Sequence, residues 1–146
     1  MGDIRILRAG MVEHTVMAEE MKRLQQLRIE DKIPDTLILV EHPEVVTVGP
    51  KAIRDGVVVE GYPTVNTDRG GGITWHGPGQ LVAYPIIKWG VDEQNIRAII
   101  GRLEDWAIDA LAELGISAYK DSTMQGAWVD GYKICSIGLS FLNWVS

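Results

Sequence analysis

The most regular hydrophobic pattern along the chain is helical and spans residues 93–114. Its apolar side chains recur every three or four residues, which places them on one face of a helix. Gly115 follows in the position that favours a helix C-terminal cap. A second helical face runs from His14 to about Lys32, with Pro34 just beyond it, and carries four apolar side chains at the same spacing: Met17, Met21, Leu24 and Leu27. The pattern therefore predicts two main helices.

Short runs of β-forming residues lie between and after these helices. Residues 36–41 form a continuous apolar run, which is typical of a buried strand. Residues 50–61 indicate a loop with one short strand, and Asp130-Gly131 is a dipeptide that favours the two-residue turn of a hairpin. The remaining predicted strands cover residues 3–8, 45–49, 64–67, 80–87, 116–120 and the two arms of the hairpin within 126–142. The last arm is predicted to run almost to Ser146, with nothing after it to pair with it or cover it.

Helices and strands are interleaved without a strict β-α alternation, and no repeat, linker or low-complexity tract interrupts them. This order predicts fold class α+β, with a mixed β-sheet and two main helices packed on it. The length of 146 residues fits a single domain, residues 1–146. Because 46% of the residues are apolar, the chain can bury a hydrophobic core.

The charge and composition of the chain argue against some classes of binding partner. A net charge of −6 without a basic run argues against nucleic acid. No apolar run approaches the roughly 18 residues of a membrane span, and the N-terminus lacks a signal-peptide core. We therefore expect a cytoplasmic protein with no membrane partner, and the single cysteine, Cys135, suits a reducing compartment. The three histidines, His14, His42 and His76, lack the spacing of a zinc site, so no metal site is predicted.

A glycine-rich segment, RGGGITWH at residues 69–76, is the first candidate site. Glycines let backbone amides approach a ligand where any Cβ would collide with it. Arg69 adds a charged fork, while Thr74 and His76, two apart on a predicted strand, would face one pocket. The alternative is a turn between two strands with His76 packed in the core, and spacing alone does not decide between the two. The segment matches neither GxGxxG followed by a helix nor GxxxxGK[ST], which argues against nucleotide phosphate binding.

The second candidate is KICSIG, residues 133–138. Lys133 and Cys135 would point to the same face of a strand, where the ammonium lowers the pKa of the thiol and favours a nucleophilic thiolate. A lone cysteine in an apolar strand is more often part of the core, so the residues alone favour a packing role. His42 in LVEHP is likewise more often a turn residue than a ligand.

Four stretches, in this order, resemble the octanoyltransferases of lipoate biosynthesis: LVEHPEVVTVG, DRGGGITWHGPGQLVAYPII, AELGI and GAWVDGYKICSIGL. The resemblance runs from about residue 10 to residue 142, and the RGGxxTxHGPGQLVxYPI block is its most specific part. That family is related in fold to the biotin and lipoate protein ligases, so the resemblance implies their α+β catalytic domain, incomplete at the C-terminus.

The resemblance also implies a reaction. An octanoyl group moves from octanoyl-acyl carrier protein to a lysine of a lipoyl domain through an acyl-thioester on a cysteine. The acceptors would be lipoyl domains of 2-oxoacid dehydrogenases or the glycine cleavage H protein. The family needs no metal, nucleotide or other cofactor.

Residue by residue, the resemblance assigns Lys133 the catalytic role of the lysine that lowers the pKa of the nucleophile. Ile73, Trp75 and Ile137 have side chains suited to lining an apolar slot for the octanoyl chain. Glycine amides or the Lys133 ammonium are suited to stabilising an oxyanion. The implied acyl-binding residues form two stretches: Arg69, Gly70, Gly71, Gly72, Ile73, Thr74, Trp75 and His76, then Ser136, Ile137 and Gly138.

The resemblance breaks down at the nucleophile. In this family the nucleophilic cysteine lies further along, beyond a His-Gly-containing strand, and Cys135 is not at its position. We therefore expect the nucleophile beyond residue 146 and expect this chain to be the N-terminal two thirds of an octanoyltransferase, inactive alone. Two alternatives stay open: a non-catalytic acyl-binding or scaffold subunit, and a lipoate- or biotin-activating ligase that uses a nucleotide.

Overall fold

The computed structural model describes residues 2–146 and divides them into two compact units. The first runs through Trp89 and includes Leu139–Ser146, and the second is Gly90–Gly138. Elements of the first unit are β1 (Arg5–Met11), α1 (His14–Ile29), β2 (Thr36–Glu41), β3 (Val45–Val48), α2 (Pro50–Arg54), β4 (Thr64–Asn66), β5 (Ile73–His76) and β6 (Val82–Ile86). Those of the second are the short 3-10 helix η1 (Val91–Glu93), α3 (Ile96–Glu113), β7 (Ala127–Val129) and β8 (Tyr132–Cys135).

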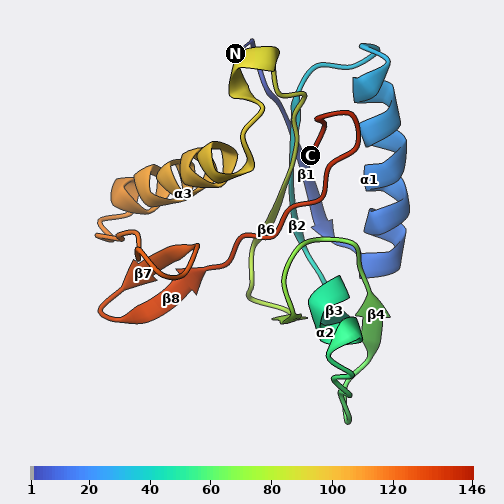
Figure 1. The fold of residues 1–146 in the computed structure, drawn as a ribbon, viewed down its shortest axis with the longest axis vertical. Coiled ribbons are helices and arrows are strands. Elements are labelled where there is room, and N and C mark those ends of the chain that lie inside the picture. Colours follow the sequence, from blue (N-terminus) through green and yellow to red (C-terminus); the bar gives the residue numbers. More distant parts are fainter. Residues whose placement is uncertain (1) are drawn as a thin grey trace. The chain divides into compact units, whose positions relative to one another are not determined.

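The core of the first unit lies between α1 and a three-stranded sheet in the order β1-β2-β6 (Figure 1). Strand β2 buries Thr36, Ile38 and Val40 and leaves the alternate side chains half-buried, so only one face of it joins this core. Met17 and Leu24 of α1 pack against that face. Each fully buried side chain of this size contributes about 1.5–3 kcal/mol to folding.

A second sheet, in the order β4-β3-β5, carries the glycine-rich segment. All four residues of the central strand β3 are buried. Strand β5 pairs with β3 in antiparallel register, with Thr74 opposite Thr47 and His76 opposite Val45. The residues that precede and form β5 are thereby held against a buried strand.

The second unit consists of α3 and the hairpin β7-β8. The Asn95 side chain accepts a hydrogen bond of 3.0 Å from the Ala98 amide, which caps the start of α3. Asp130 and Gly131 have φ angles of 50° and 83°, as the central residues of a type I′ turn require. The hairpin predicted around this dipeptide is confirmed.

The predicted α+β class is confirmed, with differences in its details. The strands form three sheets, of which the two three-stranded ones are each mixed. The strand predicted within residues 50–61 is wrong: Pro50 starts the short helix α2, and no strand follows before β4. Residues 116–120 contribute one isolated bridge, between Tyr119 and Trp128, rather than a strand.

The C-terminal residues also differ from expectation. The last strand ends at Cys135, and residues 139–146 belong to the first unit, where Val145 is fully buried in the core beside α1. The Gln25 side chain donates a 2.8 Å hydrogen bond to the Val145 carbonyl. The predicted uncovered last strand is therefore wrong. No helix among residues 2–146 is long and apolar enough to cross a membrane.

Candidate functional site

The loop that opens RGGGITWH is fastened to β3 by the side chain of Arg69. Its Nη2 donates to the carbonyl and hydroxyl of Thr47 at 3.1 and 2.7 Å and to the Gly72 carbonyl at 3.1 Å. Its Nη1 donates to the Gly70 carbonyl at 3.1 Å. The guanidinium is therefore bonded to the loop's own backbone and to β3, and it acts first as a clamp on the loop.

Close contact between Gly49 and the loop completes this attachment. The Gly49 amide donates to the Gly72 carbonyl at 2.8 Å, and a Cβ on Gly49 would lie 2.3 Å from the Gly71 carbonyl oxygen. No real side chain tolerates that distance, so glycine is required at the end of β3 for the loop to lie where it does. The glycine-rich segment is thus an ordered part of the second sheet.

Strand β5 presents different side chains on its two faces. Ile73 and Trp75 are 45% and 42% exposed, whereas Thr74 and His76 are half-buried. The Trp75 indole N–H donates to the Glu44 carboxylate at 3.0 Å, which fixes the ring. Two large apolar side chains therefore share one exposed face of the strand.

His76 belongs to a cluster of three histidines. The ring centroids of His14 and His42 lie 5.1 Å apart, and that of His76 lies 6.2 and 5.8 Å from them. His42 is fully buried, with Nδ1 2.7 Å from the Val12 carbonyl and Nε2 2.8 Å from the Tyr84 hydroxyl. Both of its ring nitrogens are therefore occupied, and the residues that the structure describes contain no group arranged to hold a metal ion.

Burial favours the neutral form of two members of this cluster, His14 and His76. Burial, reinforced by the neighbouring imidazoles and Arg69, lowers the pKa of His14 to about 4. Burial also lowers the pKa of His76 and raises the pKa of Tyr84 to about 12. The Tyr84 hydroxyl thus keeps its proton and can donate a hydrogen bond to Nε2 of His42. His14 Nδ1 is buried with no hydrogen-bond partner.

The turn HGPGQ follows directly and is held by two side chains. Gln80 contacts His76 Nδ1 through its oxygen at 2.6 Å and donates to the Trp75 carbonyl through its nitrogen at 3.1 Å. Glu41, the last residue of β2, accepts a 2.7 Å hydrogen bond from the Gly79 amide. The turn is thus tied to both three-stranded sheets of the first unit.

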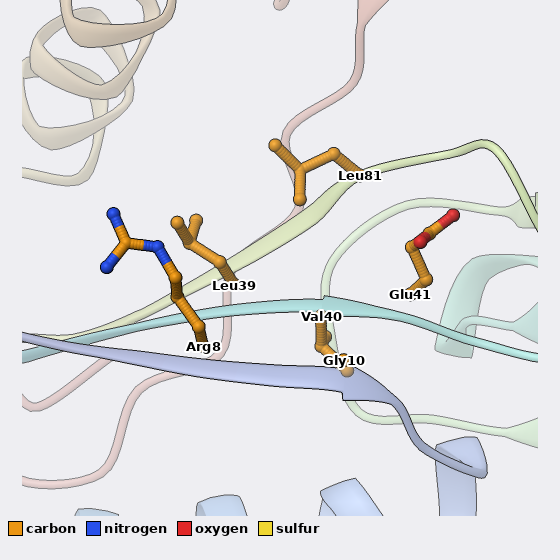
Figure 2. Close-up of a pocket in the computed structure, with 6 residues that line it drawn as sticks. All are labelled: Arg8, Gly10, Leu39, Val40, Glu41 and Leu81. Carbon is orange, nitrogen blue, oxygen red and sulfur yellow. The ribbon is translucent and has the colours of Figure 1, made fainter.

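A shallow hollow of about 240 Å³ lies on the face of the first sheet opposite α1. Figure 2 shows Arg8, Leu39 and Leu81 projecting into it from β1, β2 and the start of β6, with Glu41 at one end. None of the predicted site residues lines it. It is an apolar surface separate from the exposed face of Ile73 and Trp75.

In the second unit, Lys133 lies on β8 and its side chain passes close to Gly126. A Cβ on Gly126 would lie 2.7 Å from Lys133 Cε and 2.4 Å from the Cys135 carbonyl. The buried Glu104 of α3 accepts a 2.9 Å hydrogen bond from the Gly126 amide and so fixes this crossing. The Lys133 ammonium lies 5.8 Å from the centre of the Trp128 ring. These contacts restrict the position of the Lys133 ammonium beside β8.

Cys135 is not activated as a nucleophile in this unit. Burial raises the pKa of its thiol, and the positive charge of Lys133 offsets that only in part. The effect of Lys133 has the direction expected of a residue that lowers the pKa of a thiol. At Cys135 the effect of the Lys133 charge is smaller than that of burial, so the pKa of this thiol stays above its ordinary value.

Ser136, Ile137 and Gly138 follow β8 as an irregular segment. The Gln125 side chain donates a 2.9 Å hydrogen bond to the Ile137 carbonyl, and Ile137 is half-buried. The structure therefore brings Arg69 to His76 together in the first unit, and Lys133 together with Ser136, Ile137 and Gly138 in the second.

Several residues that shape these two sites were not predicted from sequence, among them Gln80, Glu104 and Gly126. The histidine cluster was also missed, because it depends on a strand pairing that was not predicted from the sequence. Strands β1 and β2 are parallel neighbours, so His14 and His42, which follow their C-terminal ends, must lie close together. His42 was interpreted as a turn residue, yet it is fully buried and hydrogen-bonded at both nitrogens.

Comparison with known proteins identifies the family to which the chain belongs. Residues 15–146 match the family described as the lipoyl protein ligase A/B catalytic domain. The octanoyltransferase of Syntrophobacter fumaroxidans is 36% identical over 97% of this chain and 65% of its own length. That of Salinispora arenicola is 38% identical over 94% of this chain and 67% of its own. The chain thus spans about two thirds of the length of these relatives.

The fold recurs in a solved structure of low sequence similarity. The bi-partite lipoate protein ligase of Thermoplasma acidophilum superposes with a TM-score of 0.61 at 14% identity, covering 89% of this chain and 52% of that one. Its α+β architecture is the one described above. The chain belongs to the octanoyltransferase family, within the superfamily of lipoyl and biotin protein ligases.

Proposed function

We propose that this chain supplies the acyl-binding segment and the activating lysine of an enzyme that moves an octanoyl group from octanoyl-acyl carrier protein to a lysine of a lipoyl domain. The reaction would pass through an acyl-thioester on a cysteine, in lipoate biosynthesis and in the cytoplasm. Membership of the octanoyltransferase family supports the reaction class. It implies an acyl carrier protein as donor and a lipoyl domain as acceptor.

The proposal rests on how the segment Arg69 to His76 is attached to β3 and on which of its side chains are exposed. Arg69 and Gly49 fasten the loop to a buried strand, so the segment is rigid before any ligand arrives. Ile73 and Trp75 then offer exposed apolar area on one face of β5, which a saturated chain of eight carbons prefers to water. The thioester carbonyl needs a hydrogen-bond donor, which the glycine amides of the segment are proposed to supply.

Lys133 is proposed to act by its charge. The close approach of its side chain to Gly126 and to the Trp128 ring restricts where the ammonium lies. The positive charge lowers the pKa of a neighbouring thiol. Cys135 is not proposed as the nucleophile, because burial raises the pKa of its thiol. Ser136, Ile137 and Gly138 are proposed as the second acyl-binding stretch.

Calorimetric titration of octanoyl-loaded against unloaded carrier protein tests the proposal. We expect the octanoyl group to strengthen binding by at least tenfold, which is about 1.4 kcal/mol, without added nucleotide. Equal affinity for the two forms would contradict acyl recognition. Binding of octanoate only together with ATP would instead favour a ligase. Acyl-dependent binding by a stable 146-residue protein that co-purifies with a second chain would favour the scaffold subunit.

A further inference from the structure

The Gln80 side chain makes two hydrogen bonds at once, and together they fix its orientation. One end lies 2.6 Å from His76 Nδ1 and the other 3.1 Å from the Trp75 carbonyl oxygen. A carbonyl oxygen can only accept, so the amide nitrogen of Gln80 must face Trp75. The amide oxygen therefore faces His76, and because it can only accept, Nδ1 of His76 must carry the proton.

We infer that Gln80 is a positioning residue that holds His76 in its Nδ1–H tautomer, so that Nε2 keeps a lone pair and accepts a hydrogen bond from the amine of the acceptor lysine. This inference rests on the proposed function for the identity of the donor. A free neutral imidazole prefers the opposite tautomer, with the proton on Nε2. Gln80 thus reverses the ordinary hydrogen-bonding character of the ring at Nε2.

The surroundings favour the neutral ring that this arrangement needs. His14 stacks against His76 from α1, His42 packs at its edge from the end of β2, and Arg69 bears positive charge nearby. A second proton, on Nε2, would make the ring a cation and add a positive charge beside these groups. The turn itself is braced by the bonds from Gln80 N to the Gly77 carbonyl and from Gly79 N to Glu41, so Gln80 cannot easily swing away.

The tautomer decides what His76 can recognise. A ring with Nε2–H would donate to a thioester carbonyl or an oxyanion, whereas a ring with a bare Nε2 can only accept. The octanoyl chain and its thioester carry no N–H or O–H group. Of the two substrate groups that react, the thioester and the amine of the acceptor lysine, only the amine can donate. His76 is therefore assigned to orienting the amine, and stabilisation of the oxyanion falls to other groups.

Nitrogen-15 NMR of the histidine rings tests the assignment, because protonated and bare ring nitrogens have well-separated chemical shifts. In the 146-residue chain at pH 7, His76 should show a protonated Nδ1 and a bare Nε2. In Gln80→Leu the proton should move to Nε2, and in Gln80→Glu, which keeps an acceptor, it should stay on Nδ1. His42 is the internal control, since the Val12 carbonyl holds its Nδ1 proton in every variant. A wild-type His76 protonated on Nε2, or an unchanged tautomer in a folded Gln80→Leu, overturns the inference.

Two further measurements keep the test decisive. If circular dichroism shows that Gln80→Leu does not fold, the wild-type and Gln80→Glu spectra decide the tautomer. Titration with a lipoyl domain should shift the His76 Nε2 signal, and a lipoyl domain with its target lysine replaced by methionine, which has no donor in its side chain, should not. Equal shifts with both domains refute the role in amine recognition. If the tautomer is as inferred but octanoyl-loaded carrier protein is not recognised, the proposed function fails and the role of Gln80 stands.

Discussion

Replacing Gly49 by alanine should loosen the Arg69–Gly72 loop from the second sheet. The new Cβ would lie 2.3 Å from the Gly71 carbonyl oxygen and 3.0 Å from that of Gly72, and these are backbone atoms that cannot rotate away. Overpacking of this kind costs about 1–3 kcal/mol. The 2.8 Å bond from the Gly49 amide to Gly72 would also lengthen, at a cost of about 1 kcal/mol. We expect a loss of about 2–4 kcal/mol in the free energy of unfolding.

Urea unfolding followed by tryptophan fluorescence measures this loss. With a slope of about 2 kcal/mol per molar urea, the midpoint should fall by about 1–2 M. Gly72→Ala is the matched control in the same loop, because a Cβ there has no neighbour within 4 Å and its φ is not left-handed. Its midpoint should move by less than about 0.5 M. Equal midpoints for the two variants would show that the loop does not rest on β3 as described.

Three other perturbations test the remaining parts of the two sites. Lys133→Ala should raise the pKa of the Cys135 thiol further, seen as slower alkylation by iodoacetamide at pH 8, and an unchanged pH profile would refute an electrostatic role. Glu104→Ala leaves the Gly126 amide unpaired and should cost about 1–3 kcal/mol in urea unfolding. Glu104→Gln, which keeps an acceptor, should cost clearly less, and equal costs would count against that hydrogen bond. The pKa of the His14 side chain falls from 6.5 to about 4 on folding. The unfolded chain therefore binds this proton more readily than the folded protein, so the free energy of unfolding decreases as the pH falls from 6.5 toward 4. Between pH 7 and pH 5 the wild type should lose about 2 kcal/mol more than His14→Gln, and parallel losses would contradict the shift.

The elements predicted best from the sequence are those with a local cause. The helix of residues 96–113 follows from its apolar spacing, and the β7-β8 turn follows from the backbone freedom of Asp130-Gly131. Strand β2 has the predicted bounds, although its continuous apolar run buries only one face against α1. Local patterns identify an element, but which of its faces is covered depends on what packs there.

The site was harder to predict because its contacts join residues distant in the chain. Nothing local to Arg69 indicates that it binds Thr47, and nothing local to Gly126 indicates that the Lys133 side chain passes over it. The resemblance of RGGGITWH and KICSIG to a family points to these two segments as candidate sites, and their acyl-binding and catalytic roles stay predictions. Their internal geometry, including the tautomer imposed by Gln80, depends on tertiary contacts that spacing does not encode.

The proposed position of the octanoyl chain, against Arg69 to His76, can be mapped directly by photo-crosslinking. The probe is a carrier protein that bears an octanoyl thioester with a diazirine at the end of the chain, and peptide mapping locates the label. We expect labelling on the exposed face of β5, at Ile73 and Trp75, and its loss in the presence of excess octanoyl-carrier protein. Labelling confined to the hollow of Leu39 and Leu81, or spread evenly over the surface, would contradict that position.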